Sequence, residues 1–188
     1  VYLAKTPCLD ELMNSKLYTQ LKAHGTAVGM PSDDDMGNSE VGHNALGAGR
    51  VFDQGAKLVQ KSIESKEIFN TPIWHKLVER VKNDNKIFHF IGLLSDGNVH
   101  SHIDQLLAML RQCAQEGVRR VRVHTLLDGR DVYEKSALTY IEKLENVLKE
   151  INTSHKYYDY CIASGGGRMV VTMDRYNADW SIVERGWK

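Results

Sequence analysis

The sequence lacks the features of a secreted, membrane or nucleic-acid-binding protein. Its three cysteines, Cys8, Cys113 and Cys161, are odd in number and far apart, so neither a disulfide framework nor a zinc site is indicated. No apolar run approaches a membrane span and no signal-peptide core stands at the N-terminus, so we expect a cytoplasmic protein. The 24 basic and 24 acidic residues cancel, which gives no electrostatic reason to expect nucleic acid or an anionic membrane as a partner.

Common cofactor motifs are also absent. There is no GxxxxGK[ST] segment, which speaks against a nucleoside triphosphate site of that type. The run Gly165 to Gly167 is not a GxGxxG with an acidic partner, so it is a weak dinucleotide signal. Five histidines show no metal-ligand spacing and are interpreted as structural or solvated: His24, His75, His89, His124 and His155.

Proline is scarce as well, and none follows Pro72. From residue 86 onward, apolar strand-like segments alternate with amphipathic ones, which predicts an α/β fold: a parallel sheet with helices on both faces. The strands are expected at 87–94, 120–127 and 159–163, and the helices at 101–115, 136–151 and 173–187. The second of these helices aligns Leu138, Ile141, Leu144, Leu148 and Ile151 on one face.

The earlier part of the chain is less regular. Thr6-Pro7 and Thr71-Pro72 each predict a helix start, with threonine as N-cap and proline in the first turn. Residues 26–30 are expected to form a short strand, and 51–67 to form connecting helices. The helix after Thr71 should bury one face, made of Ile73, Trp74, Leu77, Val78 and Val81.

The segment Met36 to His43 contains a candidate nucleophile, Ser39, with Gly37 before it and Gly42 after it. Small neighbours allow a sharp turn and close approach of a substrate. A helix through Ala48 would put Ser39 at a helix N-terminus, where free N–H groups favour an anion such as phosphate. The simpler alternative is that Ser39 is only an N-cap.

Polar loops follow the three expected strands at 95–102, 128–131 and 164–168. In parallel α/β sheets, ligands bind at the carboxyl ends of the strands, so these loops should share one site. Arg130 and Arg168 could hold a phosphate or carboxylate in bidentate fashion. Each loop also has a plainer interpretation, because Asp128 and Asp131 could cap turns and His100 or His102 could be polar residues at a helix end.

Taken in order, these motifs resemble the cofactor-independent phosphoglycerate mutases, metal-dependent members of the alkaline phosphatase superfamily. The resemblance covers essentially the whole chain, and it is carried by residues 24–29, 36–49, 94–102, 127–132 and 162–175. It implies interconversion of 3-phosphoglycerate and 2-phosphoglycerate in glycolysis and gluconeogenesis, through a phosphoserine and without 2,3-bisphosphoglycerate. By the same resemblance, Ser39 is the nucleophile and a ligand of one of two divalent ions, Mn²⁺ foremost, with Co²⁺ or Mg²⁺ as alternatives.

The resemblance also assigns substrate-binding positions to His100, Arg130, Asp131, Arg168 and Arg175. Asp131 would act on the glycerate hydroxyls. The other metal ligands of the family have no counterpart here, and Asp33, Asp34 and Asp35 do not match them. We therefore expect these 188 residues alone to be inactive, and the protein to be a monomer acting on a small molecule.

The implied organisation is part of a phosphatase-like domain over residues 1–58, a linker over 59–70, and the first part of an inserted phosphotransferase domain over 71–188. Two other functions stay open. One is a related metal-dependent phosphatase or phosphomutase of the same superfamily. The other is a non-catalytic fragment.

Overall fold

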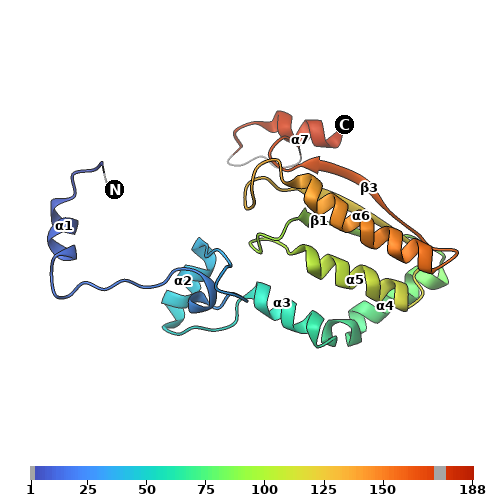
Figure 1. Cartoon of the computed structure of the whole chain (residues 1–188), viewed down its shortest axis with the longest axis horizontal. Helices are drawn as coiled ribbons and strands as arrows, with labels where there is room; N and C mark the ends of the chain where they lie inside the picture. The colour runs from blue at the N-terminus through green and yellow to red at the C-terminus, as the bar shows by residue number, and fades with distance from the viewer. Residues whose placement is uncertain (1–2, 172–176) are drawn as a thin grey trace.

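A three-stranded parallel sheet organises the larger part of the molecule (Figure 1). The computed structural model describes residues 3–171 and 177–188. Strands β1 (Phe88–Leu94), β2 (Arg120–Leu127) and β3 (Asp159–Gly167) pair in the order β1-β2-β3, joined by helices α5 (Ile103–Gln115) and α6 (Ala137–Ser154). The α/β class and the parallel sheet expected from sequence are confirmed.

The remaining elements precede or follow this unit. They are α1 (Pro7–Met13), η1 (Gly25–Val28), α2 (Ser39–Ala48), α3 (Gly55–Glu64), η2 (Glu67–Asn70), α4 (Pro72–Asn83) and α7 (Trp180–Trp187). Helix α1 stands apart at one end, joined to α2 by an extended segment (Figure 1). Within the described residues, no helix is long and apolar enough to cross a membrane.

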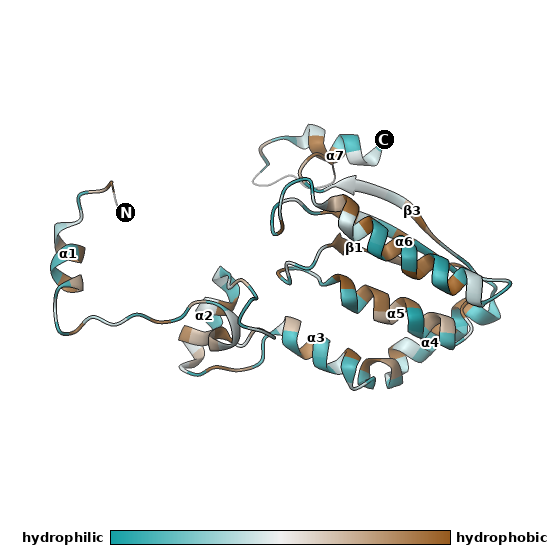
Figure 2. Ribbon diagram, in the orientation of Figure 1, coloured by the Kyte–Doolittle hydropathy of each residue, from teal (hydrophilic) through white to brown (hydrophobic). Residues whose placement is uncertain are grey.

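The core lies between the sheet and helices α4, α5 and α6. Alternate residues of β2, Val121, Val123 and Thr125, are buried against it, and Leu110 and Leu144 of the two crossover helices are fully enclosed. Apolar and polar residues alternate around α5 and α6 accordingly (Figure 2). The opposite face of the sheet is more open, since Ile91 is 77% exposed there.

A second, smaller cluster surrounds α2 and consists of Val28, Met30 and Val41. Ala56 at the start of α3 packs against this cluster, whereas Ile63 at its end belongs to the main core. Helix α3 therefore spans the boundary proposed between residues 58 and 59. The three-part division of the chain stays a prediction.

Both threonine-proline helix starts occur where they were expected. Thr71 caps α4 by accepting the Trp74 N–H at 3.3 Å, and Pro72 is its first residue. The predicted apolar face of α4 is only partly buried: Trp74 and Val78 are enclosed, but Ile73 is 74% exposed. Leu138 of α6 is likewise 71% exposed. A helix that packs on one side buries a single stripe, and these side chains lie outside it.

Two strand predictions need correction. Most of the segment expected as a strand at 26–30 belongs to the 3-10 helix η1, which Gly29 caps with φ 84°. A Cβ on Gly29 would lie 1.8 Å from the Phe52 carbonyl oxygen, so the chain turns closely against another segment there. Strand β3 does not end at Ala163 but continues through the glycine run to Gly167. It passes so close to β2 that a Cβ on Gly165 would lie 2.7 Å from Thr125 Oγ1.

Of the expected last helix, residues 180–187 form α7 and 172–176 lie outside the described residues.

Candidate active site

Ser39 is the first residue of α2, not its cap. The N-cap is Asn38, whose Oδ1 accepts the Val41 N–H at 3.1 Å, so the alternative role proposed for Ser39 is wrong. Gly37 is required by packing, since a Cβ there would lie 1.8 Å from the Ala23 carbonyl oxygen. Ser39 itself is exposed. Its hydroxyl thus lies at the N-terminus of a ten-residue helix without being used to cap it.

His43, one turn further along α2, contacts Ser39 and was passed over in the sequence. Its Nδ1 lies 2.6 Å from the Ser39 carbonyl oxygen and 3.2 Å from Ser39 Oγ. A carbonyl oxygen only accepts, so Nδ1 carries the proton in the shorter contact and is not a base toward Oγ. The i, i+4 spacing from a candidate nucleophile was the available signal.

Four of the five predicted substrate-binding residues line one cleft of ≈ 650 Å³. His100 comes from the loop after β1, Arg130 and Asp131 from the loop after β2, and Arg168 directly follows β3. Asn38, the residue before Ser39, lines the same cleft. The carboxyl edge of the sheet and the start of the serine helix therefore face a common space. The fifth residue, Arg175, lies outside the described residues.

Arg168 is buried in this cleft and neutralised by carboxylates. It is 4% exposed, and its Nη1 donates to Asp131 Oδ2 at 2.8 Å and to Asp128 Oδ1 at 3.2 Å. His100 Nε2 lies 3.7 Å from the same Asp131 oxygen. Arg130, in contrast, is exposed. The two arginines thus differ in character: one is a fixed donor among acids and the other a cation at the surface.

One hydrogen bond links the serine side of the cleft to the sheet side. Asn98 Nδ2 donates to Asp35 Oδ1 at 2.9 Å, and Asn98 is only 7% exposed. Asp35 is held in turn, because its Oδ2 accepts the Ser32 N–H at 2.7 Å. The acidic turn before the serine helix is therefore a structural contact of the substrate loop. Nothing local in the sequence indicates a pairing across 63 residues.

Comparison with known proteins now gives the family. The family model described as the BPG-independent PGAM N-terminus (iPGM_N) matches residues 59–188, more than half of the chain. The chain belongs to the cofactor-independent phosphoglycerate mutase family.

Relatives of high similarity carry the same family name. A Leptospira interrogans protein, "Probable 2,3-bisphosphoglycerate-independent phosphoglycerate mutase", is 57% identical over 98% of this chain and 33% of its own length. The 2,3-bisphosphoglycerate-independent phosphoglycerate mutase of Zea mays is 52% identical over the whole chain and 33% of its own length. The chain spans about a third of the length of the curated relatives it matches.

A solved mutase structure shares the fold. The chain matches a structure titled "Crystal structures of Leishmania mexicana phosphoglycerate mutase at low cobalt concentration" with a TM-score of 0.87 and 50% identity. The match covers 99% of this chain and 34% of that one. The relation therefore holds at the level of both sequence and fold, over one part of a larger mutase.

The described residues of this chain do not by themselves make a metal site. No three His, Cys, Asp or Glu side chains gather among them where an ion could be held. The nearest acidic turn is engaged elsewhere, since Asp33 Oδ1 accepts the Thr26 N–H at 3.0 Å and Asp35 contacts Asn98. Ser39 supplies one oxygen, which is too few donors for a divalent ion.

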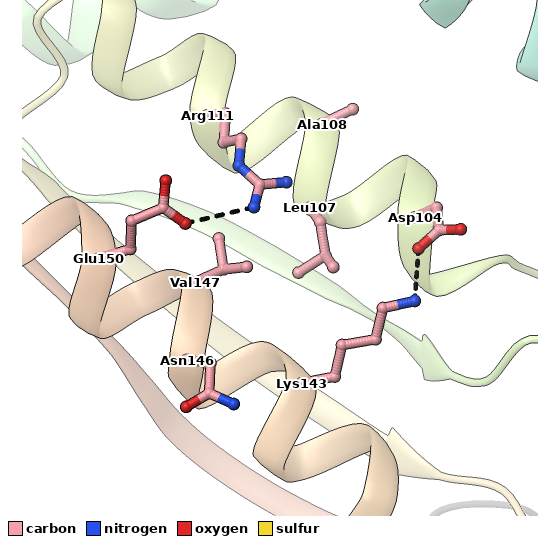
Figure 3. A pocket seen from close by; sticks show the side chains of 8 residues that line it. All are labelled: Asp104, Leu107, Ala108, Arg111, Lys143, Asn146, Val147 and Glu150. Carbon is pink, nitrogen blue, oxygen red and sulfur yellow. Dashed lines mark hydrogen bonds and ion pairs between the residues drawn. The ribbon is translucent and has the colours of Figure 1, made fainter.

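A second depression in the chain lies on the outer side of the helices, between α5 and α6 (Figure 3). Lys143 pairs with Asp104 at 2.6 Å, and Arg111 pairs with Glu150 at 3.3 Å. These ion pairs bridge the two helices, and within each pair the cation and the carboxylate neutralise each other. The depression therefore offers no reactive group, and the cleft at the sheet edge is the candidate active site.

Proposed function

We propose that the full-length protein carrying this chain interconverts 3-phosphoglycerate and 2-phosphoglycerate without added 2,3-bisphosphoglycerate. The observation that carries this proposal is the shared cleft, in which basic and acidic groups from three strand ends face the start of the serine helix. The names of the relatives support the same reaction. In this proposal the chain is part of a longer protein, because it spans only about a third of those relatives. The full-length protein is proposed to be a cytoplasmic monomer.

Ser39 is the proposed phosphoryl acceptor. The Ser39 hydroxyl releases its proton as its oxygen attacks phosphorus, the bond from phosphorus to the C3 oxygen of the glycerate breaks, and the C3 oxygen takes up one proton. The glycerate then turns, and its C2 hydroxyl releases a proton as it attacks the phosphoserine. The bond from phosphorus to the serine oxygen breaks, and that oxygen takes up a proton, which restores the serine. An exposed hydroxyl at a helix N-terminus suits this role, because the negative charge of the phosphoryl group is favoured there.

The remaining cleft residues are proposed to bind and orient the glycerate. Arg130 and Arg168 suit the phosphate and carboxylate oxygens, because a guanidinium offers several donors in a fixed plane. Asp131 and His100, 3.7 Å apart, suit the hydroxyls that exchange the phosphoryl group. Arg175 is proposed as a further cation. No nucleic acid or membrane partner is part of the proposal.

Two divalent ions complete the proposed site, with Mn²⁺ as the first candidate and Co²⁺ or Mg²⁺ as alternatives. Within the described residues only Ser39 is assigned as a ligand, so the proposal places the other ligands in parts of the full-length protein outside this chain.

The test is phosphorus NMR of the full-length protein with 3-phosphoglycerate and Mn²⁺, with no bisphosphoglycerate added. Appearance of the 2-phosphoglycerate signal, and its loss with a chelator, is the expected result. Release of inorganic phosphate instead would favour a phosphatase of the same superfamily. No change in the spectrum over prolonged incubation with any of the three metals would overturn the proposal and favour a non-catalytic role.

A further inference from the structure

A buried carboxylate, Asp128, lies beneath the candidate site. Its side chain is 1% exposed, and it is not among the residues that line the cleft. It follows the last residue of β2, Leu127, and so begins the loop that carries Arg130 and Asp131. Burying a carboxylate costs desolvation free energy unless hydrogen-bond donors surround it. The donors around Asp128 therefore show which groups it holds in place.

The donors to Asp128 come from all three loops at the sheet edge. Ser95 Oγ, after β1, donates to Oδ2 at 2.6 Å. The N–H groups of Arg130 and Asp131 donate to Oδ1 at 3.0 and 3.1 Å. Arg168 Nη1, after β3, donates to the same oxygen at 3.2 Å. One side chain therefore joins the three segments that deliver the cleft residues.

These contacts keep Asp128 charged. Burial raises the pKa of its carboxyl, whereas the hydrogen bond from Ser95, two backbone N–H groups and the Arg168 guanidinium lower it; the net result is a pKa below the ordinary value. The charge fixes the direction of every bond, because a carboxylate only accepts. Asp128 thus differs from a neutral turn cap, which could reorient.

Ser95 extends the connection to the loop that bears His100. It is 1% exposed, and while it donates to Asp128 its Oγ accepts the Gly97 N–H at 3.1 Å. Its carbonyl oxygen accepts the Ile103 N–H at 2.7 Å, at the start of α5. Ser95 therefore connects both ends of the loop at 95–102 to Asp128.

We propose that Asp128 is a positioning residue: it fixes the Arg168 guanidinium and the Arg130–Asp131 segment in the geometry that binds the substrate anion. This inference rests on the proposed function of the cleft. Arg168 contacts both Asp128 and Asp131 through Nη1, and these two contacts leave Nη2 and Nε to other partners. Asp128 acts through these groups and touches no substrate, because it lies behind the cleft wall.

The experiment compares Asp128→Asn with Asp96→Asn in the full-length protein. Both changes replace a carboxylate by an amide of the same shape in the same group of loops. Asp96 serves as the matched control, because it accepts the Tyr140 hydroxyl at 2.6 Å and neither of these two residues lines the cleft. We expect Asp128→Asn to raise the KM for 3-phosphoglycerate about tenfold or more, since hydrogen bonds to charged groups are lost, and Asp96→Asn to change it less than threefold.

A double-mutant cycle separates positioning from general damage. If Asp128 acts through Arg168, then Asp128→Asn should add little to the KM of Arg168→Lys. Independent effects, multiplying in the double variant, would overturn the proposal, as would a KM within twofold of wild type for Asp128→Asn. Should Asp128→Asn fail to fold, Ser95→Ala replaces it in the same cycle, with the same two outcomes.

Calorimetry with 3-phosphoglycerate gives the dissociation constant without turnover, and so it separates the two proposals. A wild type that binds 3-phosphoglycerate but does not isomerise it refutes the proposed reaction while the cycle in binding still tests Asp128. A wild type that neither binds nor isomerises it overturns both.

Discussion

Replacing Gly97 by alanine should displace Asp131, because the added methyl group would crowd Asp131 from the neighbouring loop. Gly97 lies in the loop after β1, and a Cβ built on it would lie 2.9 Å from the Asp131 carbonyl oxygen and 3.1 Å from Asp131 Cβ. An ordinary contact of this kind is 3.4 Å or longer. Because two of the near atoms are backbone, the loop at 128–131 must move by several tenths of an ångström to admit the methyl group.

The cost of that movement can be bracketed. Overpacking a well-packed site usually costs about 1–3 kcal/mol in stability. A misplacement of about 1 Å at a reacting group costs on the order of a hundredfold in rate. A shift of roughly half that size should therefore lower kcat/KM about tenfold, through the altered position of Asp131 relative to Arg168 and His100.

The assay is kcat/KM for conversion of 3-phosphoglycerate in the full-length protein, with Gly92→Ala as the control. Gly92 lies in β1, and a Cβ there meets no atom within 4 Å, so this variant should retain wild-type kinetics. Thermal unfolding of both variants reports how much stability is lost. If Gly97→Ala were as active as Gly92→Ala, the position of Asp131 would not matter to the reaction at this precision, and the reasoning would fail.

Three further substitutions probe the cleft in the full-length protein. Ser39→Ala should abolish mutase activity with an unchanged circular dichroism spectrum, since losing a nucleophile costs many orders of magnitude; turnover above a few per cent of wild type would refute the covalent role. Arg168→Lys should raise KM about tenfold or more, because a planar fork held by two carboxylates becomes a point charge; an unchanged KM would exclude Arg168 from binding. Asn98→Gly removes the bond to Asp35 while suiting the left-handed backbone there, at φ 54°; kcat/KM should fall severalfold with little change in melting temperature, and a loss of stability alone would make the bond merely structural.

Periodicity located the strands and helices of the sheet unit. Strand β2 begins and ends where it was expected, at residues 120 and 127, and Gly117, with φ 84°, follows the end of α5. The carboxyl-edge rule likewise brings residues from three separate loops to one cleft. These features could be predicted because they depend only on neighbouring residues in the sequence or on the direction of the strands.

Other features depended on contacts that no local pattern encodes. The glycine run at 165–167 was expected as a loop, yet it is part of β3. At Gly165 a Cβ would lie 2.7 Å from Thr125 Oγ1 of β2, so a larger residue does not fit beside that strand there. Residues 26–28 are flanked by Gly25 and Gly29, both with positive φ, which favour a tight helical turn over a strand. Pairings such as Asp35 with Asn98 are set by tertiary packing, and single residues far apart give no sign of them.

The charged residues of the cleft show that the residue types at a site do not by themselves give its electrostatic potential. From sequence alone, Arg130 and Arg168 are two cations that repel each other unless an anion lies between them. In the structure two carboxylates already surround Arg168, so this arginine contributes directed donors rather than net positive charge. In the proposed reaction, attraction of an anionic three-carbon acid then depends more on the exposed Arg130, whose backbone N–H donates to Asp128. In this arrangement the buried Arg168 would orient the substrate and the exposed Arg130 would attract it. Such a separation suits the proposed reaction, in which the glycerate must turn around without leaving the cleft.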